Sequence, residues 1–219
     1  SKWIANEGRL SPVFANAKII KHIYNWISLD IFYPRQTVEL RKKLGIEKDD
    51  FIVLGVSQKW SDYKGLNHFI TIANKIPDVK ILMVGYMPDG VILPDNVISV
   101  PPVSSPDELA TYYSLGDVFL NFSIQETFGK VTAEALACGT PLIVNNATAN
   151  PELCGNGCGF VIDNNDHEQM IKAIKTIRKN GKSAYSNRCR SFAQDNFDKE
   201  KGINNYVALF SEMIKNKSK

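Results

Sequence analysis

Residues 118–144, VFLNFSIQETFGKVTAEALACGTPLIV, decide the fold class of this chain. Two apolar runs, at 118–122 and 141–144, flank a helical pattern at 128–138 that ends at Gly139. Both runs are continuous rather than alternating in apolar residues, as in strands buried on both faces of a parallel sheet. The stretch therefore predicts a β-α-β unit with parallel strands.

The same alternation of strand and helix patterns extends on both sides of this unit. Further strands are predicted at 51–56, 80–84, 97–100 and 159–162, and helices near 36–43, 65–75, 106–115 and 149–154. This order predicts an α/β fold, a Rossmann-like doubly wound parallel sheet of about six strands. Beyond 162 only extra C-terminal helices are expected: one that starts at Asp166, one near 183–195, and one near 198–215 with Asp198 as its N-cap. Residues 1–45 are less regular, apart from the helix near 36–43.

Composition and spacing exclude several classes of protein. The 219 residues carry a net charge of only +3, which argues against nucleic acid as a partner. No apolar run is long enough to span a bilayer, and no secretory leader is recognisable. Cys154 and Cys158 are close, but there is no second cluster, and His22, His68 and His167 are scattered, so reduced thiols and no metal site are expected. The first strand is not followed by G-x-G-x-x-G, so no dinucleotide cofactor is expected.

Candidate binding groups follow two of the predicted strands, at the strand ends where open α/β sheets bind ligands. The loop after 51–56 carries Lys59 and Lys64, compact cations that suit the two charges of a diphosphate, with ordinary surface lysines as the alternative. The helix that starts after Gly129 offers free backbone N–H groups and the positive end of its dipole. Gly129 has no Cβ, which lets a ligand approach the backbone.

Glu126 and Glu134 frame this helix start. Eight residues of helix rise about 12 Å, whereas paired carboxylates of glycoside hydrolases lie roughly 5–10 Å apart. The two glutamates are therefore predicted to hold opposite ends of one extended ligand, such as a sugar joined through a diphosphate to a ribose. The alternative is that Glu126 interacts with the helix dipole and Glu134 is an exposed helix residue.

Residues 123–143, SIQETFGKVTAEALACGTPLI, resemble the E-x7-E signature of retaining glycosyltransferase family 4, the glycosyl transferases group 1. The similarity continues in HIYNWISLDIFYP (22–34), LATYYSLGDVFLNFS (109–123) and Pro151-Glu152. The resemblance implies a GT-B fold of two Rossmann-like domains, of which this chain is the C-terminal, donor-binding half. It implies a linker segment at 1–30, the nucleotide-sugar-binding domain at 31–197, and a crossing helix with a basic tail at 198–219. The N-terminal, acceptor-binding domain would be absent from this chain.

The resemblance also implies roles for single residues. Glu126, Lys59 and Lys64 would be catalytic: Glu126 at the transferred sugar and the two lysines at the diphosphate. Lys59 stands where the family usually has an arginine, so the charge is kept but the bidentate fork is lost. The remaining donor-binding residues are Glu134 at the ribose, the backbone N–H groups of Phe128, Gly129, Lys130 and Val131 at the diphosphate and sugar, and Gly85, Tyr86 and Val103 near the base.

The reaction so implied is transfer of a sugar from UDP-, GDP- or another nucleoside-diphosphate sugar to an acceptor hydroxyl, with retention and without metal or cofactor. Assembly of polysaccharide, capsule or lipopolysaccharide is the expected setting, in the cytoplasm or at the inner face of the membrane, with a lipid-linked acceptor as a further partner. The lysines and the helix start would stabilise the leaving diphosphate. A nucleotide-sugar-binding module without activity and a nucleotide-sugar epimerase of related fold remain the alternatives.

Overall fold

A six-stranded parallel sheet forms the centre of the computed structural model, which describes residues 1–163 and 166–217. The strand order is β3-β2-β1-β4-β5-β6, and every neighbouring pair is parallel. The strands are β1 Ile52–Lys59, β2 Lys80–Tyr86, β3 Val97–Val100, β4 Val118–Asn121, β5 Leu142–Asn145 and β6 Gly159–Ile162. The predicted Rossmann-like fold is therefore confirmed, with all six expected strands in place.

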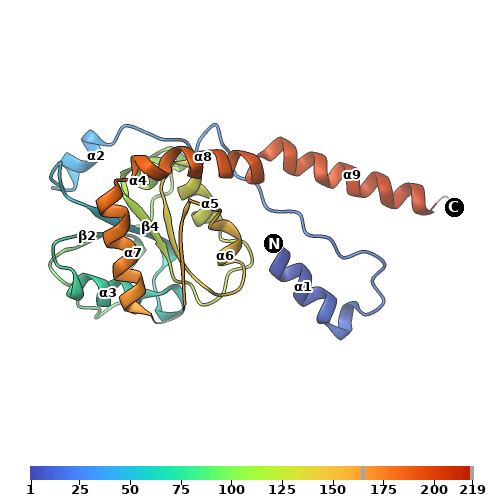
Figure 1. The fold of residues 1–219 in the computed structure, drawn as a ribbon, viewed down its shortest axis with the longest axis horizontal. Coiled ribbons are helices and arrows are strands. Elements are labelled where there is room, and N and C mark those ends of the chain that lie inside the picture. The colour runs from blue at the N-terminus through green and yellow to red at the C-terminus, as the bar shows by residue number, and fades with distance from the viewer. Residues whose placement is uncertain (164–165, 218–219) are drawn as a thin grey trace.

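Helices cover both faces of the sheet, which explains the continuous apolar runs (Figure 1). Ile52 and Leu54 of β1 face one core and Val53, between them, faces the other. The first core includes residues of α2 (Val38–Lys43), α4 (Pro106–Leu115), α5 (Lys130–Ala137) and α8 (Ser183–Phe197). The second core includes residues of α3 (Leu66–Lys75) and α7 (His167–Asn180). The short α6, Asn150–Leu153, follows β5.

Both predicted helix caps in the C-terminal third are confirmed. The Asp166 carboxylate accepts a hydrogen bond from the Gln169 N–H at 2.8 Å, at the start of α7. The Asp198 carboxylate accepts one from the Lys201 N–H at 2.9 Å, at the start of α9 (Lys199–Lys217). The last residues of the expected basic tail, 218–219, lie outside the described residues.

Two local predictions were wrong. β1 runs to Lys59 rather than ending at 56, because the pairing with β2 resumes after an irregularity between Val56 and Lys59 and the Trp60 N–H donates to the Tyr86 carbonyl at 2.8 Å. The N-terminal region contains α1, Lys2–Leu10, and the 3-10 helix η1, Pro12–Phe14, where no helix was expected.

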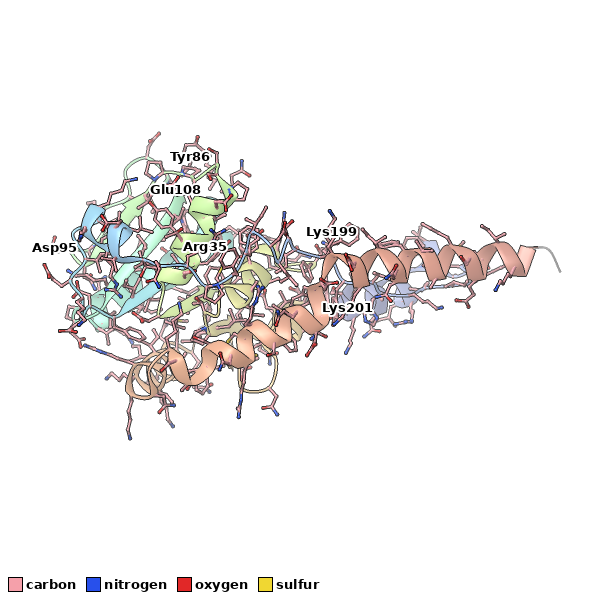
Figure 2. The ribbon with its side chains drawn as sticks, turned by 90° about the horizontal axis from the view of Figure 1, so that it is seen from above. Arg35, Tyr86, Asp95, Glu108, Lys199 and Lys201 are labelled. Atoms are coloured by element: carbon pink, nitrogen blue, oxygen red, sulfur yellow. The ribbon has the colours of Figure 1, made fainter. Side chains whose placement is uncertain are left out.

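α1 and α9 lie to one side of the sheet (Figure 1), and α9 extends away from it beyond Lys199 and Lys201 (Figure 2). Several apolar side chains of α9 are exposed, among them Ile203, Val207 and Phe210. None of the described helices combines the length and apolarity needed to cross a membrane.

Candidate functional site

A cleft of about 510 Å³ opens at the carboxyl ends of β1 and β4. These strands are neighbours, and the chain order runs outward from them in opposite directions, so the cleft is at the switch point where doubly wound sheets bind ligands. Among the residues that line it are five of the predicted site residues: Lys59, Lys64, Glu126, Lys130 and Val131.

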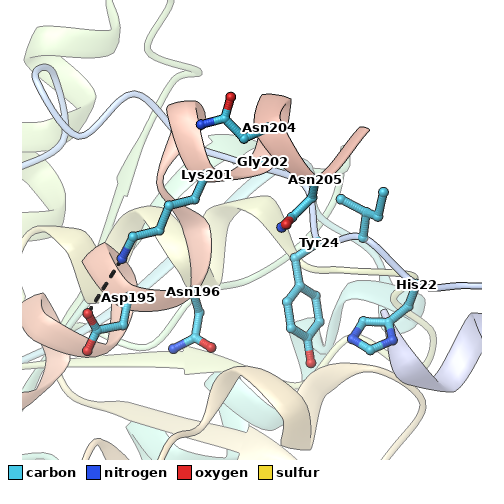
Figure 3. Close-up of a pocket in the computed structure, with 9 residues that line it drawn as sticks. His22, Tyr24, Asp195, Asn196, Lys201, Gly202, Asn204 and Asn205 are labelled. Atoms are coloured by element: carbon cyan, nitrogen blue, oxygen red, sulfur yellow. Dashed lines mark ion pairs between the residues drawn. The ribbon is translucent and has the colours of Figure 1, made fainter. Parts of the chain in front are cut away.

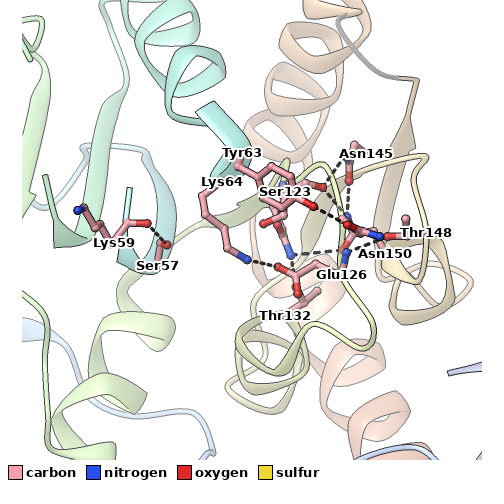
Figure 4. Close-up of polar contacts among 12 residues, drawn as sticks. Ser57, Lys59, Tyr63, Lys64, Ser123, Glu126, Thr132, Asn145, Thr148 and Asn150 are labelled. Atoms are coloured by element: carbon pink, nitrogen blue, oxygen red, sulfur yellow. Dashed lines mark hydrogen bonds and ion pairs between the residues drawn. The ribbon is translucent and has the colours of Figure 1, made fainter. Parts of the chain in front are cut away.

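The cleft brings together Lys64 and Glu126, which are 62 residues apart in the sequence. The Lys64 Nζ lies 2.7 Å from the Glu126 Oε1, and both side chains are partly shielded, with exposed fractions of 36% and 17% (Figure 4). Lys64 ends a 3-10 turn, Asp62–Lys64, that is closed by Gly65 at φ +81°. A Cβ at Gly65 would lie 2.9 Å from the Phe122 Cβ, so the glycine lets this turn approach the end of β4.

Lys59 lies at the same cleft but apart from this pair. Its side chain is exposed at the end of β1, and Figure 4 shows it pointing away from Lys64 and Glu126. The Ser57 hydroxyl donates to the Lys59 carbonyl at 2.9 Å, which orders the strand end. Lys59 and Lys64 could hold one diphosphate together once the Lys59 side chain turns toward Lys64.

The start of α5 provides backbone donors beside the pair. Gly129 is the N-cap at φ +88° and makes no side-chain cap. Among the described residues no hydrogen bond from the N–H groups of residues 128–131 is found, so they are available to an anion. The Phe128 ring is buried against the rings of Tyr24 and Phe197, so Phe128 can meet a ligand only through its backbone.

Glu134 is buried on α5, so the alternative of an exposed helix residue was wrong. Its side chain accepts a hydrogen bond from the Tyr113 hydroxyl at 2.9 Å, and its Oε1 lies 3.8 Å from the exposed Lys130 Nζ. Burial raises the pKa of Glu134 above its ordinary value. The hydrogen bond from the Tyr113 hydroxyl and the charge of Lys130 lower this pKa but offset only part of the effect of burial. Glu134 does not line the cleft itself but lies one helical turn behind Lys130.

The residues predicted near the base are beside the cleft rather than in it. Gly85, at φ +136°, and the exposed Tyr86 end β2, whereas Val103 follows β3. A Cβ at Gly85 would lie 1.8 Å from the Ser57 carbonyl oxygen, so this position requires glycine. Gly85, Tyr86 and Val103 are not among the residues that line the cleft. Their contact with a base stays a prediction.

The sequence analysis missed a group of buried carboxamides (Figure 4). They hold the loop between β4 and α5, residues 122–129, which carries Glu126 and is called the Glu126 loop below. Asn121, at the end of β4, donates to the Thr132 hydroxyl at 2.8 Å and accepts from the Ser123 N–H at 3.0 Å. Asn145 and Asn150 both donate to the Ser123 carbonyl, at 2.8 and 3.2 Å. A usable signal was present, since asparagines at the ends of two apolar strands must find partners when buried.

The histidines, which the sequence analysis described as scattered, also require a correction. The His68 Nδ1 and the His167 Nε2 are 3.1 Å apart, because α3 and α7 lie on the same face of the sheet. In the part of the chain that the structure describes, no group of three or more His, Cys, Asp or Glu side chains is arranged to hold a metal ion.

Comparison with known proteins agrees with this arrangement. A protein of the capsule (cps) region of Klebsiella pneumoniae, of 41.2 kDa, is 27% identical over 198 residues, which are 87% of this chain and 54% of that protein. N-acetyl-alpha-D-glucosaminyl L-malate synthase of Bacillus anthracis is 25% identical over 217 residues, which are 90% and 55% of the two chains. The chain thus spans about half the length of the curated relatives it matches.

Solved structures with a similar fold are also found. Anabaena HepE, solved in complex with UDP-glucose, superimposes with a TM-score of 0.76 at 22% identity, over 88% of this chain and 57% of that one. The sequence model of the family described as glycosyl transferases group 1 matches residues 36–196, the part that holds the sheet, the cleft and the buried carboxamides. The chain belongs to the glycosyl transferases group 1 family.

Proposed function

We propose that this chain is the donor-binding half of a glycosyltransferase that takes a sugar from a nucleoside-diphosphate sugar. The family match, the name of the Bacillus relative as a synthase of N-acetyl-alpha-D-glucosaminyl L-malate and the UDP-glucose bound to HepE support this proposal. A second Rossmann-like domain would supply the acceptor site. The partners of this chain would be the nucleotide sugar and the second domain. The enzyme would act in the cytoplasm or at the inner face of a membrane.

One observation carries the proposal: the Lys64–Glu126 pair and the uncapped start of α5 meet in a single cleft. The ammonium of Lys64 and the N–H groups at Gly129 are donors for the diphosphate, where charge develops as the glycosidic bond to the donor breaks. Glu126, once Lys64 has turned to the phosphates, faces the sugar. Glu134 accepts from the ribose hydroxyls.

The same donors would make the reaction independent of a divalent metal. Lys59, Lys64 and the helix start offset the charge of the leaving diphosphate, and the acceptor would attack with retention at the anomeric carbon. The test is isothermal titration calorimetry of the chain with UDP, GDP and UDP-glucose in EDTA. Binding that disappears with the chelator and returns with magnesium would show that the metal-free mechanism is wrong.

Two substitutions test the division of roles between the glutamates. Glu134→Ala should weaken binding of both UDP and UDP-glucose, because both carry the ribose, whereas Glu126→Ala should weaken only UDP-glucose. Loss of a charge-assisted hydrogen bond corresponds to about 10- to 150-fold in affinity. Glu39→Ala, at an exposed position of α2, is the matched control and should change neither affinity. Equal losses of UDP affinity in both variants would contradict the assignment.

We expect residues 1–219 to bind donor without transferring the sugar, because transfer requires the acceptor to be held against the anomeric carbon. Such positioning contributes about 7–11 kcal/mol to lowering the barrier. A longer chain with the second domain should release nucleotide only when acceptor is present. Transfer by residues 1–219 at the rate of the longer chain would contradict this expectation.

A further inference from the structure

Glu152, on α6, makes contacts that the proposed function does not explain. Its two carboxylate oxygens accept hydrogen bonds from the N–H groups of Lys2 and Trp3, at 2.8 and 2.7 Å, at the start of α1. The Tyr24 hydroxyl donates to the same carboxylate at 2.9 Å. Burial raises the pKa of Glu152, but these three donors to the charged form together hold it below its usual value. The Glu152 side chain thus binds both α1 and the segment that carries Tyr24 to α6.

The segment just before α6 is bonded to the backbone of Glu126 on both sides. The Glu126 N–H donates to the Thr148 hydroxyl at 2.9 Å (Figure 4). The Ala149 N–H donates to the Glu126 carbonyl at 3.2 Å. Thr148 has φ +51°, the one positive φ of a non-glycine residue in the described chain. Such a conformation persists only when neighbouring contacts enforce it. Two hydrogen bonds therefore link the segment before α6 to the backbone of Glu126.

Tyr24 provides a second route to the same loop. Its ring centroid is 6.1 Å from that of Phe128, the residue before Gly129, and 5.7 Å from that of Phe197. Tyr24 also lines a pocket of about 360 Å³ between the linker and the start of α9 (Figure 3). The segment that carries Tyr24, the end of α8 and the Glu126 loop therefore share one aromatic contact, in which the Phe128 and Phe197 rings are buried and Tyr24 is partly buried.

We infer that Glu152 and Tyr24 are positioning residues for Glu126: the hydrogen bonds of Glu152 with the start of α1 and with Tyr24 fix α6, and α6 fixes the backbone of the sugar-facing carboxylate. The inference rests on the proposed function for the role of Glu126 at the sugar. Its mechanical part, the link from α1 to the Glu126 backbone, stands on the hydrogen bonds alone. The inference assigns α1 and the segment that carries Tyr24 a direct part in setting the geometry of the donor site.

Amide hydrogen exchange measured by NMR tests the mechanical link without any ligand. Glu152→Gln replaces one acceptor oxygen by an amide that cannot accept from an N–H of α1. Exchange should accelerate by about fivefold or more at Trp3 and also at Glu126 and Ala149. Tyr24→Phe, which keeps the ring but removes the hydroxyl, should act in the same direction. Glu7→Gln, an exposed glutamate of α1, is the matched control and should leave all three amides unchanged.

Calorimetry with UDP and UDP-glucose then separates positioning from general loss of structure. Glu152→Gln and Tyr24→Phe should lower the affinity for UDP-glucose by about fivefold and leave that for UDP unchanged, since only the sugar meets Glu126. If the unsubstituted chain binds neither nucleotide, the proposed function fails, and the exchange experiment alone decides the mechanical link. If it binds both, while the variants keep the exchange at Glu126 and the UDP-glucose affinity of the unsubstituted chain, the inference is overturned.

Discussion

Replacing Tyr113 by phenylalanine should destabilise the fold because it leaves a buried carboxylate without its donor. Tyr113 is fully buried, and its hydroxyl donates to the Glu134 Oε2 at 2.9 Å. The phenylalanine ring fills nearly the same space, so the lost hydrogen bond dominates the effect. A buried acceptor left unsatisfied costs about 1–3 kcal/mol. For a domain of this size, that corresponds to a fall in Tm of roughly 2–12 °C.

The adjacent residue offers a matched control. Tyr112 is 1% exposed on the same helix, and no hydrogen bond of its hydroxyl is found among the described residues. Tyr112→Phe removes the same atom and should change the free energy of unfolding by less than about 0.5 kcal/mol. Urea unfolding of both variants measures the difference. Equal stabilities of Tyr113→Phe and Tyr112→Phe would refute the reasoning.

The effect of Tyr113→Phe should also depend on pH, with a sign that follows from the pKa of Glu134. Burial raises this pKa above its ordinary 4.5, so folding favours the protonated form and stability falls as pH rises through the folded-state pKa. The Tyr113 hydroxyl offsets part of this cost by donating to the charged form. The loss of stability in the variant should therefore be larger above the folded-state pKa of Glu134 than below pH 4.5, where the carboxyl is protonated in both states.

Two further predictions concern the stability of the fold. Gly85→Ala should cost more than about 2 kcal/mol, because its Cβ would meet the Ser57 carbonyl oxygen, whereas Gly45→Ala, also at positive φ but in open space, should cost less in the same urea experiment. Burial lowers the pKa of Lys182 to about 8 from its usual 10.5, so the unfolded chain binds more protons between these values. The stability of the unsubstituted chain relative to Lys182→Met should therefore rise from pH 8 to 10.5; a flat difference over that range would contradict the burial of a titrating ammonium.

The sheet could be predicted from the sequence because its strands are buried on both faces and therefore read as unbroken apolar runs. Local signals, such as the Asp166 and Asp198 caps, also held because each acts within one turn of its own helix. α1 was missed for the opposite reason. The N–H groups of Lys2 and Trp3 at its start are satisfied by Glu152, which lies 150 residues away from Lys2. The Ser1 hydroxyl, which accepts a hydrogen bond from the Ile4 N–H at 3.3 Å, is a local cap signal that the sequence analysis did not use.

The candidate site was predictable only in part. The spacing of Glu126 and Glu134 around a glycine-led helix start indicated an elongated anionic ligand, and the family match is consistent with that interpretation. The Lys64–Glu126 pair and the Tyr113–Glu134 bond depend on how separate elements meet, which no local pattern encodes. The roles assigned to these residues stay predictions until they are tested.

The buried asparagines that hold the Glu126 loop have a consequence for how the cleft responds to its surroundings. Carboxamides do not ionise and carry no net charge, so the bonds of Asn121, Asn145 and Asn150 keep their strength over a wide range of acidity. The partly exposed Lys64–Glu126 pair, in contrast, is weakened by dissolved salt. Ionic strength can thus tune how readily the lysine exchanges its carboxylate for an incoming anion, while the shape of the loop that presents Glu126 stays constant.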